Sequence, residues 1–113
     1  RDRFFYDIMQ NMVDNSIKAL GGIEGTKYIK CSYQFEDDHL QILMTDNGCG
    51  IPQKDWIKVF ELYYTTTEMQ GGGGVGLYIV KTRVESLKGT VAVVPSGFGS
   101  VGTTIEINIP FKN

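Results

Sequence analysis

The first half of the chain has the pattern of one helix followed by two strands. Over residues 1–20 apolar side chains recur at steps of three and four positions, which is typical of an amphipathic helix. The glycine pair at 21–22 ends that pattern. Residues 28–35 and 40–46 alternate between apolar and polar side chains, so we expect two half-buried strands joined by a polar turn. The apolar positions of the predicted helix are Phe5, Ile8, Met9, Met12, Val13, Ile17 and Leu20, and those of the first strand are Ile29, Cys31, Tyr33 and Phe35.

The second half predicts two more helices and two more strands. Residues 51–63 open on Ile-Pro, a proline placement that suits the first turn of a short helix. Residues 65–74 carry no periodic pattern and are expected to form a mobile lid before a third helix at 76–88. Strands follow at 90–94 and 102–110. This order favours helices layered on one face of a largely antiparallel sheet. The apolar positions of the short helix are Trp56, Val59, Phe60 and Tyr63.

Composition places the chain among ordinary globular domains. It has 113 residues, 42% of them hydrophobic and 21% charged, which predicts a single domain over 1–113 and excludes intrinsic disorder. No apolar run is long enough to span a membrane and no leader pattern opens the chain. Because the first residue is arginine instead of methionine, we expect a fragment of a longer protein. The formal net charge of -2 argues against a nucleic-acid binder, and the two cysteines fit reduced thiols.

Glycine is the one residue type out of proportion. There are 14 glycines, and they gather in two places, at 71–76 and at 48–50. Clustered glycine indicates backbone that adopts positive φ or approaches another group closely. Candidate chemistry is therefore expected at these two stretches.

Three polar residues share one side of the first predicted helix. Asn11, Asn15 and Lys18 fall within an arc of about 60° that borders the apolar stripe. Two carboxamide oxygens suit a hard cation with phosphates, and a lysine supplies a charge for a phosphate oxygen. A solvated polar face explains the same residues, and taken alone it is the better explanation.

Asp46 is the single residue that most specifically suggests a ligand-binding site. It keeps the parity of the apolar residues of its strand, so its carboxylate is expected to face the buried side of the sheet, where it must be hydrogen-bonded. An acceptor at a strand end, followed by Gly48 and Gly50, suits the exocyclic amine of a flat base such as adenine. An ordinary Asp-Asn-Gly turn is an equally good explanation of this stretch alone.

The glycine run at 71–76 comes directly before a predicted helix. Backbone N–H groups at a helix start, with no side chains in the way, form an anion site. The run is not a P-loop, because no Gly-Lys-Ser/Thr follows it, and no strand precedes it as a dinucleotide fingerprint requires. A flexible linker is the alternative.

Five motifs in order resemble the ATP-binding domain of sensor histidine kinases, a branch of the superfamily that includes gyrase, heat-shock chaperones and mismatch-repair ATPases. Residues 11–18 resemble the N box, N-L-x-x-N-A-x-K, and 46–51 match the first glycine box, D-x-G-x-G-I. Residues 59–64 are similar to the F box, F-E-P-F, and 72–81 to the second glycine box, G-T-G-L-G-L-A-I-V-K. Residues 102–110 resemble the closing G-T-T-F-x-F-x-L-P. The resemblance covers nearly the whole chain.

The resemblance implies an α/β fold of the Bergerat type. This is an α+β two-layer sandwich with three helices on one face of a mixed, mostly antiparallel sheet and with Mg-ATP between the layers. Asn15 would bind Mg²⁺, Lys18 a phosphate and Asp46 the adenine amine, with catalytic roles for Asn11, Asn15 and Lys18. The implied cofactor-binding residues are Asn11, Asn15, Lys18, Asp46, Gly48, Gly50, Ile51, Gly72, Gly74, Val75, Gly76, Leu77 and Thr103.

The implied activity is transfer of the γ-phosphoryl group of ATP to a histidine on a separate dimerisation domain, as the catalytic half of a two-component sensor kinase. A response regulator would act downstream. The only histidine, His39, stands in a turn before a strand and not in an acceptor sequence. Hydrolysing relatives place Glu where this chain has Asn11, and an amide is no general base, so transfer is favoured.

Two alternatives stay open. One is a self-contained ATPase of the same superfamily. The other is a degenerate nucleotide-binding module that serves as a protein-interaction surface, because Ala19 and Thr67 depart from the family pattern. We further expect a cytoplasmic domain, monomeric as this fragment and part of a full-length homodimer. The resemblance leaves open a membrane anchor elsewhere in the full-length protein.

Overall fold

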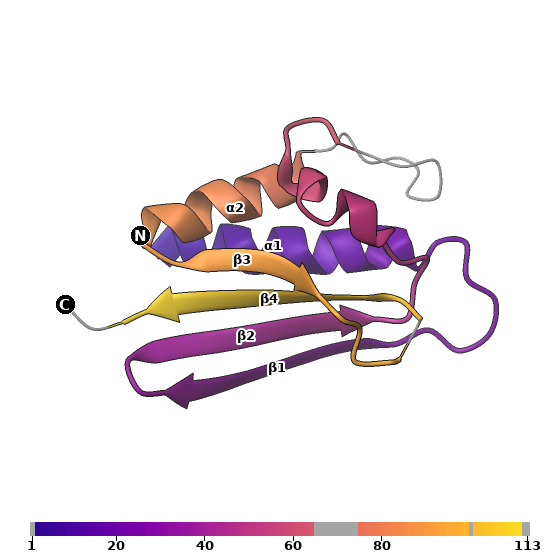
Figure 1. Cartoon of the computed structure of the whole chain (residues 1–113), viewed down its shortest axis with the longest axis horizontal. Coiled ribbons are helices and arrows are strands. Elements are labelled where there is room, and N and C mark those ends of the chain that lie inside the picture. Colours follow the sequence, from indigo (N-terminus) through magenta and orange to yellow (C-terminus); the bar gives the residue numbers. More distant parts are fainter. Residues whose placement is uncertain (1, 65–74, 100, 112–113) are drawn as a thin grey trace.

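The protein is built from two layers, a pair of helices over one face of a four-stranded sheet (Figure 1). The computed structural model describes residues 2–64, 75–99 and 101–111, so the predicted lid at 65–74 lies outside the described residues. The helices are α1 (Asp2–Ala19) and α2 (Gly76–Ser86). The strands are β1 (Ile29–Glu36), β2 (His39–Asp46), β3 (Thr90–Val94) and β4 (Thr103–Pro110).

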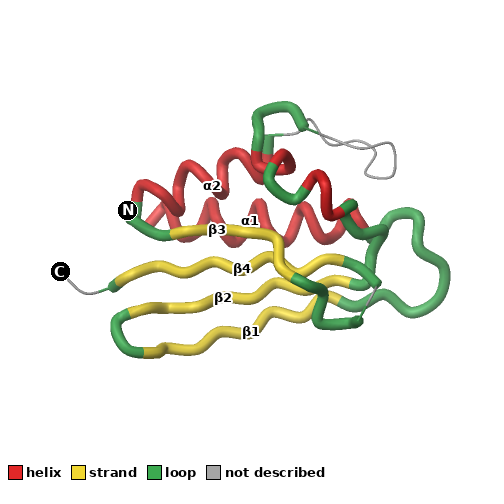
Figure 2. The backbone as a smooth tube through the Cα atoms, viewed as in Figure 1, coloured by secondary structure: helices red, strands yellow, loops and turns green. Residues whose placement is uncertain are grey.

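The strands lie in the order β1-β2-β4-β3. Each neighbouring pair is antiparallel, so the described sheet is antiparallel throughout and not mixed. The register places Asp46, the last residue of β2, opposite Thr103, the first residue of β4. The loop after α1, the loop after β2 and the connection from β3 to β4 gather at that same end of the molecule (Figure 2). The two-layer fold class expected from the sequence is confirmed.

The helix predicted over residues 51–63 differs from the structure. Two short 3-10 turns stand there, η1 (Gln53–Asp55) and η2 (Lys58–Phe60). The indole Nε1 of Trp56 donates to the carbonyl oxygen of Ile51 at 2.9 Å, which pins the segment into a compact turn. Tyr63 adopts a left-handed φ of 68° and is exposed, so it does not belong to an apolar helical stripe.

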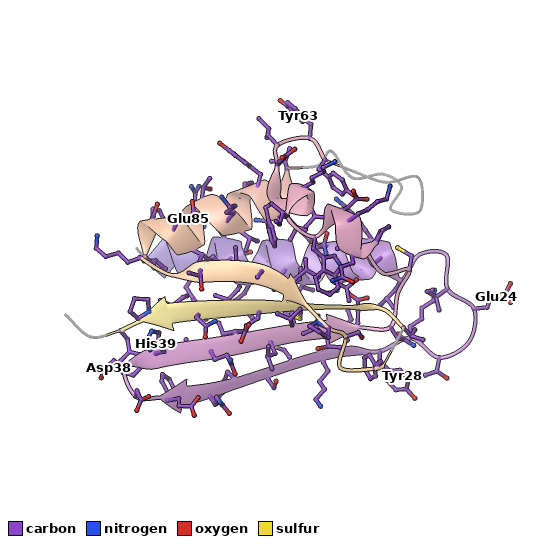
Figure 3. All side chains as sticks on the ribbon, viewed as in Figure 1. Glu24, Tyr28, Asp38, His39, Tyr63 and Glu85 are labelled. Atoms are coloured by element: carbon purple, nitrogen blue, oxygen red, sulfur yellow. The ribbon has the colours of Figure 1, made fainter. Side chains whose placement is uncertain are left out.

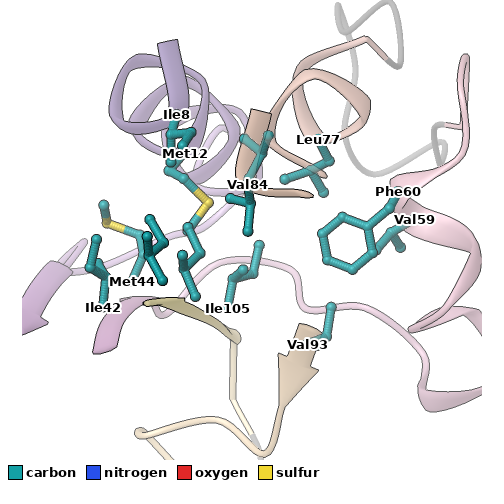
Figure 4. Packing of buried hydrophobic residues seen from close by; sticks show 13 residues of the cluster. Ile8, Met12, Ile42, Met44, Val59, Phe60, Leu77, Val84, Val93 and Ile105 are labelled. Atoms are coloured by element: carbon teal, nitrogen blue, oxygen red, sulfur yellow. The ribbon is translucent and has the colours of Figure 1, made fainter. Parts of the chain in front are cut away.

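The hydrophobic core fills the space between the helices and the sheet (Figure 4). It takes residues from both helices, from η2 and from the three strands β2, β3 and β4. Its buried members are Ile8, Met12, Ile42, Met44, Val59, Phe60, Leu77, Val80, Val84, Val93, Ile105, Ile107 and Ile109. Phe5 and Ile17, which the helical pattern assigned to the apolar stripe, are exposed at its edge.

Strand β1 is the uncovered edge of the sheet (Figure 1). Its alternation pairs Tyr33 with Ile42 and Phe35 with Leu40 across the β1–β2 ladder, so these rings are on the helical side as predicted. They are nevertheless exposed, because α1 packs over β2 and the helical layer does not extend over β1. Phe35 instead packs edge-on against Phe111, with ring centroids 5.4 Å apart.

None of the helices in the described ranges has both the length and the apolar character that a membrane-crossing segment needs.

Candidate nucleotide-binding site

Asp46 is a buried carboxylate at the end of the central strand β2. Its residue surface is only 2% exposed. The backbone N–H of Gly48 donates to its Oδ1 at 2.8 Å, and the hydroxyl of Ser16 and the backbone N–H of Thr103 also donate to the carboxylate. Burial raises the pKa of Asp46, and these three hydrogen bonds act in the opposite direction. The result is an acceptor fixed in place on the helical side of the sheet.

The loop after Asp46 packs directly on the last turn of α1. The N–H of Cys49 donates to the carbonyl oxygen of Ala19 at 3.0 Å, which satisfies one of the carbonyls that a helix end leaves unpaired. A Cβ on Gly48 would lie 2.5 Å from that same oxygen, so only glycine permits this approach. The first glycine box therefore joins the sheet to the helix at one narrow contact.

A second loop closes on the first from the side of β4. Gly102 has a left-handed φ of 80°, and a Cβ there would run into the carbonyl oxygen of Asp46. Thr103, next in the chain, is buried opposite Asp46. Gly50, also at positive φ, approaches the backbone of Gly102. The two predicted glycine-bearing loops thus lie against each other around Asp46.

The two asparagines of α1 are placed differently, although both are half-buried. Nδ2 of Asn11 donates to the carbonyl oxygen of Asp7 at 2.8 Å, and a Cβ on Gly76 would stand 3.3 Å from Asn11 Oδ1. Asn11 is therefore held between the two helices. The carboxamide of Asn15 makes no hydrogen bond with the described part of the chain, so its oxygen is available to a ligand. Lys18 is exposed at the end of α1.

Helix α2 presents its N-terminus beside these residues. Val75 precedes the helix and Gly76 is its first residue. The side chain of Leu77 is buried in the core, which leaves only its backbone for a ligand. Gly72 and Gly74, the other predicted phosphate-binding glycines, lie outside the described residues.

Ser16 is the residue of this site that the sequence analysis missed. It is 2% exposed and hydrogen-bonds Asp46. The signal was present, because Ser16 continues the four-residue spacing of Ile8 and Met12 and thus puts a hydroxyl on the buried stripe. Ile51, by contrast, was predicted, and it is half-buried with its carbonyl occupied by Trp56.

His39 lies at the other end of the sheet. It is the first residue of β2, whereas Asp46 is the last. Figure 3 places His39 far from Tyr28, whose N–H donates to Oδ1 of Asn47, the residue after Asp46, at 2.7 Å. Seven residue steps along the strand place His39 about 24 Å from Asp46.

The donor set on α1 suits magnesium better than a soft metal. In the described residues no group of three or more His, Cys, Asp or Glu side chains is close enough to hold a metal ion. Amide oxygens combined with phosphate oxygens are a usual magnesium environment. The carboxamide of Asn15, which makes no hydrogen bond with the described residues, fits one position of such a shell.

Comparisons with known proteins give the same picture. The family model described as histidine kinase-, DNA gyrase B- and HSP90-like ATPase matches residues 1–113. The chain is 37% identical over 112 residues to the autoinducer 2 sensor kinase/phosphatase LuxQ of Vibrio harveyi, covering 94% of this chain and 13% of that protein. It is 31% identical over 106 residues to a probable C4-dicarboxylate sensor kinase of Bacillus subtilis (strain 168), covering 93% and 19%. The chain thus spans less than a fifth of either relative.

Solved structures agree with the fold. A mycobacterial sensor histidine kinase, MprB, superposes with a TM-score of 0.79 at 29% identity, over 97% of this chain and 72% of that one. The catalytic domain of histidine kinase ThkA superposes with a TM-score of 0.82 at 21% identity, over 100% and 71%. With the family model matched from end to end, this chain belongs to the family of histidine kinase-, DNA gyrase B- and HSP90-like ATPases.

Proposed function

We propose that the chain binds Mg-ATP between α1, the 46–50 loop and the start of α2, and that it transfers the γ-phosphoryl group to a histidine on a separate dimerisation domain. The observation that carries the proposal is the buried carboxylate of Asp46, which lies at the end of β2 on the helical side of the sheet. A buried acceptor of this kind selects a ligand that brings its own donor. The amine of adenine is such a donor.

Each further contact follows from the placement of the side chains. Asn15 offers its amide oxygen to Mg²⁺, and Lys18 offers its ammonium to a phosphate oxygen. The N–H groups at the start of α2, from Val75 to Leu77, face the phosphates as a helix N-terminus can. When bound, Mg²⁺ neutralises charge on the phosphate oxygens. The chain's own contribution is to position the nucleotide and to stabilise that charge, which is most of what phosphoryl transfer requires.

Transfer is favoured over hydrolysis by the surroundings of Asn11. Its carboxamide is engaged with the Asp7 carbonyl and packs beside Gly76, and an amide does not accept a proton near neutral pH. The carboxylate of Asp7, which lies one turn before Asn11 on α1, is paired with Arg83 at 3.3 Å. Neither group is free to activate a water, which argues against the self-contained ATPase.

The phosphoryl acceptor must come from outside the chain. The single histidine is His39, which stands at the far end of β2 from Asp46. We infer a histidine-containing dimerisation domain, within a full-length homodimeric and cytoplasmic kinase module, and a response regulator as the later acceptor. The length of the sensor-kinase relatives, of which this chain matches only a part, supports such a multidomain protein.

The experiment compares the chain alone with the chain plus its cognate dimerisation domain, using ATP labelled at the γ-phosphate. We expect acid-labile label on the dimerisation domain only when Mg²⁺ is present. Asn15→Ala should abolish it, whereas His39→Ala should leave it unchanged. Label on His39, or phosphate release by the chain alone at the same rate as transfer, would contradict the proposal. Failure to bind ATP by calorimetry would favour the protein-interaction module instead.

A further inference from the structure

The hydroxyl of Ser16 reaches Asp46 from the helical layer. The other two donors to this carboxylate belong to the backbone of the sheet side, Gly48 in the loop after β2 and Thr103 at the start of β4. Ser16 lies on α1 and is 2% exposed. Among the donors in the described part of the chain, it alone ties the carboxylate to the helix. Asp46 is therefore held from both layers at once.

The three donors do not fill every acceptor position of the Asp46 carboxylate. An ionised carboxylate offers about four acceptor positions. Among the described residues, Gly48, Ser16 and Thr103 take three of them, which leaves one position for a ligand. A single remaining acceptor matches a single N–H of an exocyclic amine, which is a tighter requirement than a freely rotating carboxylate would impose.

We propose that Ser16 is a positioning residue that fixes the direction of the last free acceptor of Asp46 and thereby sets the preference for a base with an amine. This inference rests on the proposed ATP-binding function and deepens it. Ser16 need not touch the nucleotide. Without its hydroxyl, the carboxylate loses the one contact that holds it from the side of α1, and its free acceptor is no longer directed.

The test measures binding of two nucleotides by calorimetry, with the 113-residue chain and Mg²⁺. One is ATP, and the other is purine riboside triphosphate, which is ATP without the exocyclic amine. For Ser16→Ala we expect ATP affinity to fall about tenfold, since a hydrogen bond to a charged group is lost. Affinity for the amine-free nucleotide should change by less than about twofold, because it makes no use of the free acceptor.

The matched control is Thr45→Val. Thr45 is a buried hydroxyl that pairs with the hydroxyl of Thr104 at 2.9 Å. It neighbours Asp46 in β2, so it points to the opposite face of the sheet. Its loss should lower thermal stability while leaving the ratio of the two affinities unchanged. A purely structural role for Ser16 would make the two variants behave alike and would overturn the inference.

A double variant separates this inference from the proposed function. In an Asp46→Asn background, Ser16→Ala should no longer alter the affinity ratio, because the carboxylate that it positions is gone. A wild-type chain that binds both nucleotides equally would reject adenine recognition by Asp46 itself. A wild-type preference for ATP that survives unchanged in Ser16→Ala would reject only the role of Ser16.

Discussion

Gly48 and Ala19 stand so close that no side chain fits between them: a Cβ on Gly48 would lie 2.5 Å from the Ala19 carbonyl oxygen and 2.8 Å from the Ala19 methyl group. Ala19 itself is 4% exposed. This contact sets the distance between α1 and the loop that carries Asp46. It therefore governs folding and the geometry of the candidate site together.

Gly48→Ala should destabilise the chain by about 2 to 3 kcal/mol, because overpacking against backbone has no flexible side chain to absorb it. Gly22→Ala is the matched control, since a Cβ there meets nothing within 4 Å and surface changes cost little. Urea unfolding followed by circular dichroism measures both. Equal midpoints for the two variants would show that the loop moves away from α1 without cost.

Base selectivity is the second expectation. GTP presents a carbonyl where ATP presents an amine, so it would bring an acceptor to the ionised acceptor Asp46. The wild-type chain should bind ATP much more tightly than GTP, since buried polar groups reject mismatched partners strongly. Asp46→Asn should narrow the difference. Equal calorimetric affinities of the wild type for the two nucleotides would contradict the role given to Asp46.

The pH dependence of ATP binding should reflect the titration of the Asp46 carboxyl group. Burial raises the pKa of this carboxyl above 3.8, its ordinary value, so the folded chain holds the proton at pH values where an unfolded chain has lost it. The stabilisation that protonation gives is present below the ordinary pKa and is lost as the pH rises through the raised pKa.

The affinity for ATP should depend on pH in the opposite direction to this stabilisation, because the adenine amine needs the ionised carboxylate of Asp46 as its acceptor. Affinity should rise with pH across this window in the wild type and stay flatter in Asp46→Asn. Both proteins share the titration of the ATP phosphates, so the difference between their affinity profiles isolates the carboxyl. Calorimetry should cover the range from the ordinary pKa of an aspartic acid, about 3.9, up to about pH 8. Parallel profiles would show that Asp46 stays charged throughout.

The core makes a prediction that does not involve the site. Ile107 is fully buried in β4, and Ile57 is 87% exposed between η1 and η2. Ile107→Val should cost about 1 kcal/mol of unfolding free energy, while Ile57→Val should stay within about 0.5 kcal/mol. Both substitutions remove one methylene, and the two sites differ most in burial. Chemical denaturation compares them directly.

Substitutions of the two asparagines of α1 should have different effects on stability when measured by chemical denaturation. Asn11→Ala removes a hydrogen bond to the Asp7 carbonyl, so the unfolding free energy should fall by about 1 kcal/mol. Asn15→Ala removes no hydrogen bond within the described chain and should leave stability almost unchanged while abolishing Mg²⁺-dependent transfer. If Asn15→Ala were the less stable variant, its assignment to the metal would lose its basis.

Local patterns predicted the layers and the buried acceptor well. Asp46 keeps the parity of Ile42 and Met44, and parity alone decides the face of a strand residue. The structure accordingly buries all three on the helical side. The spacing of Ile8 and Met12 likewise predicted the buried side of α1.

The predictions that differ from the structure concern residues whose environment is set by a distant part of the chain. Tyr33 and Phe35 have the alternation of a half-buried strand, but their exposure depends on how far α1 reaches over the sheet, and the strand's own sequence does not encode that. The turns around Trp56 share apolar spacing with a helix, and the indole bond to Ile51 decides between them. Ser16 was overlooked because its importance comes from Asp46, thirty positions later.

Helix α1 contributes to both the core and the candidate site, and this limits which substitutions the helix can accept. Between Met12 and Ala19 the helix supplies Met12 to the core and Asn15, Ser16 and Ala19 to the candidate site. If that site binds a nucleotide, a substitution there is screened for folding and for ligand recognition at the same time. Gln10, on the exposed side of the helix, donates to Asp14, and neither side chain has another hydrogen bond with the described residues. Random variation in this helix should therefore survive at such outward positions and be purged elsewhere, and a library of single substitutions selected first for solubility and then for nucleotide binding would lose different members at each step.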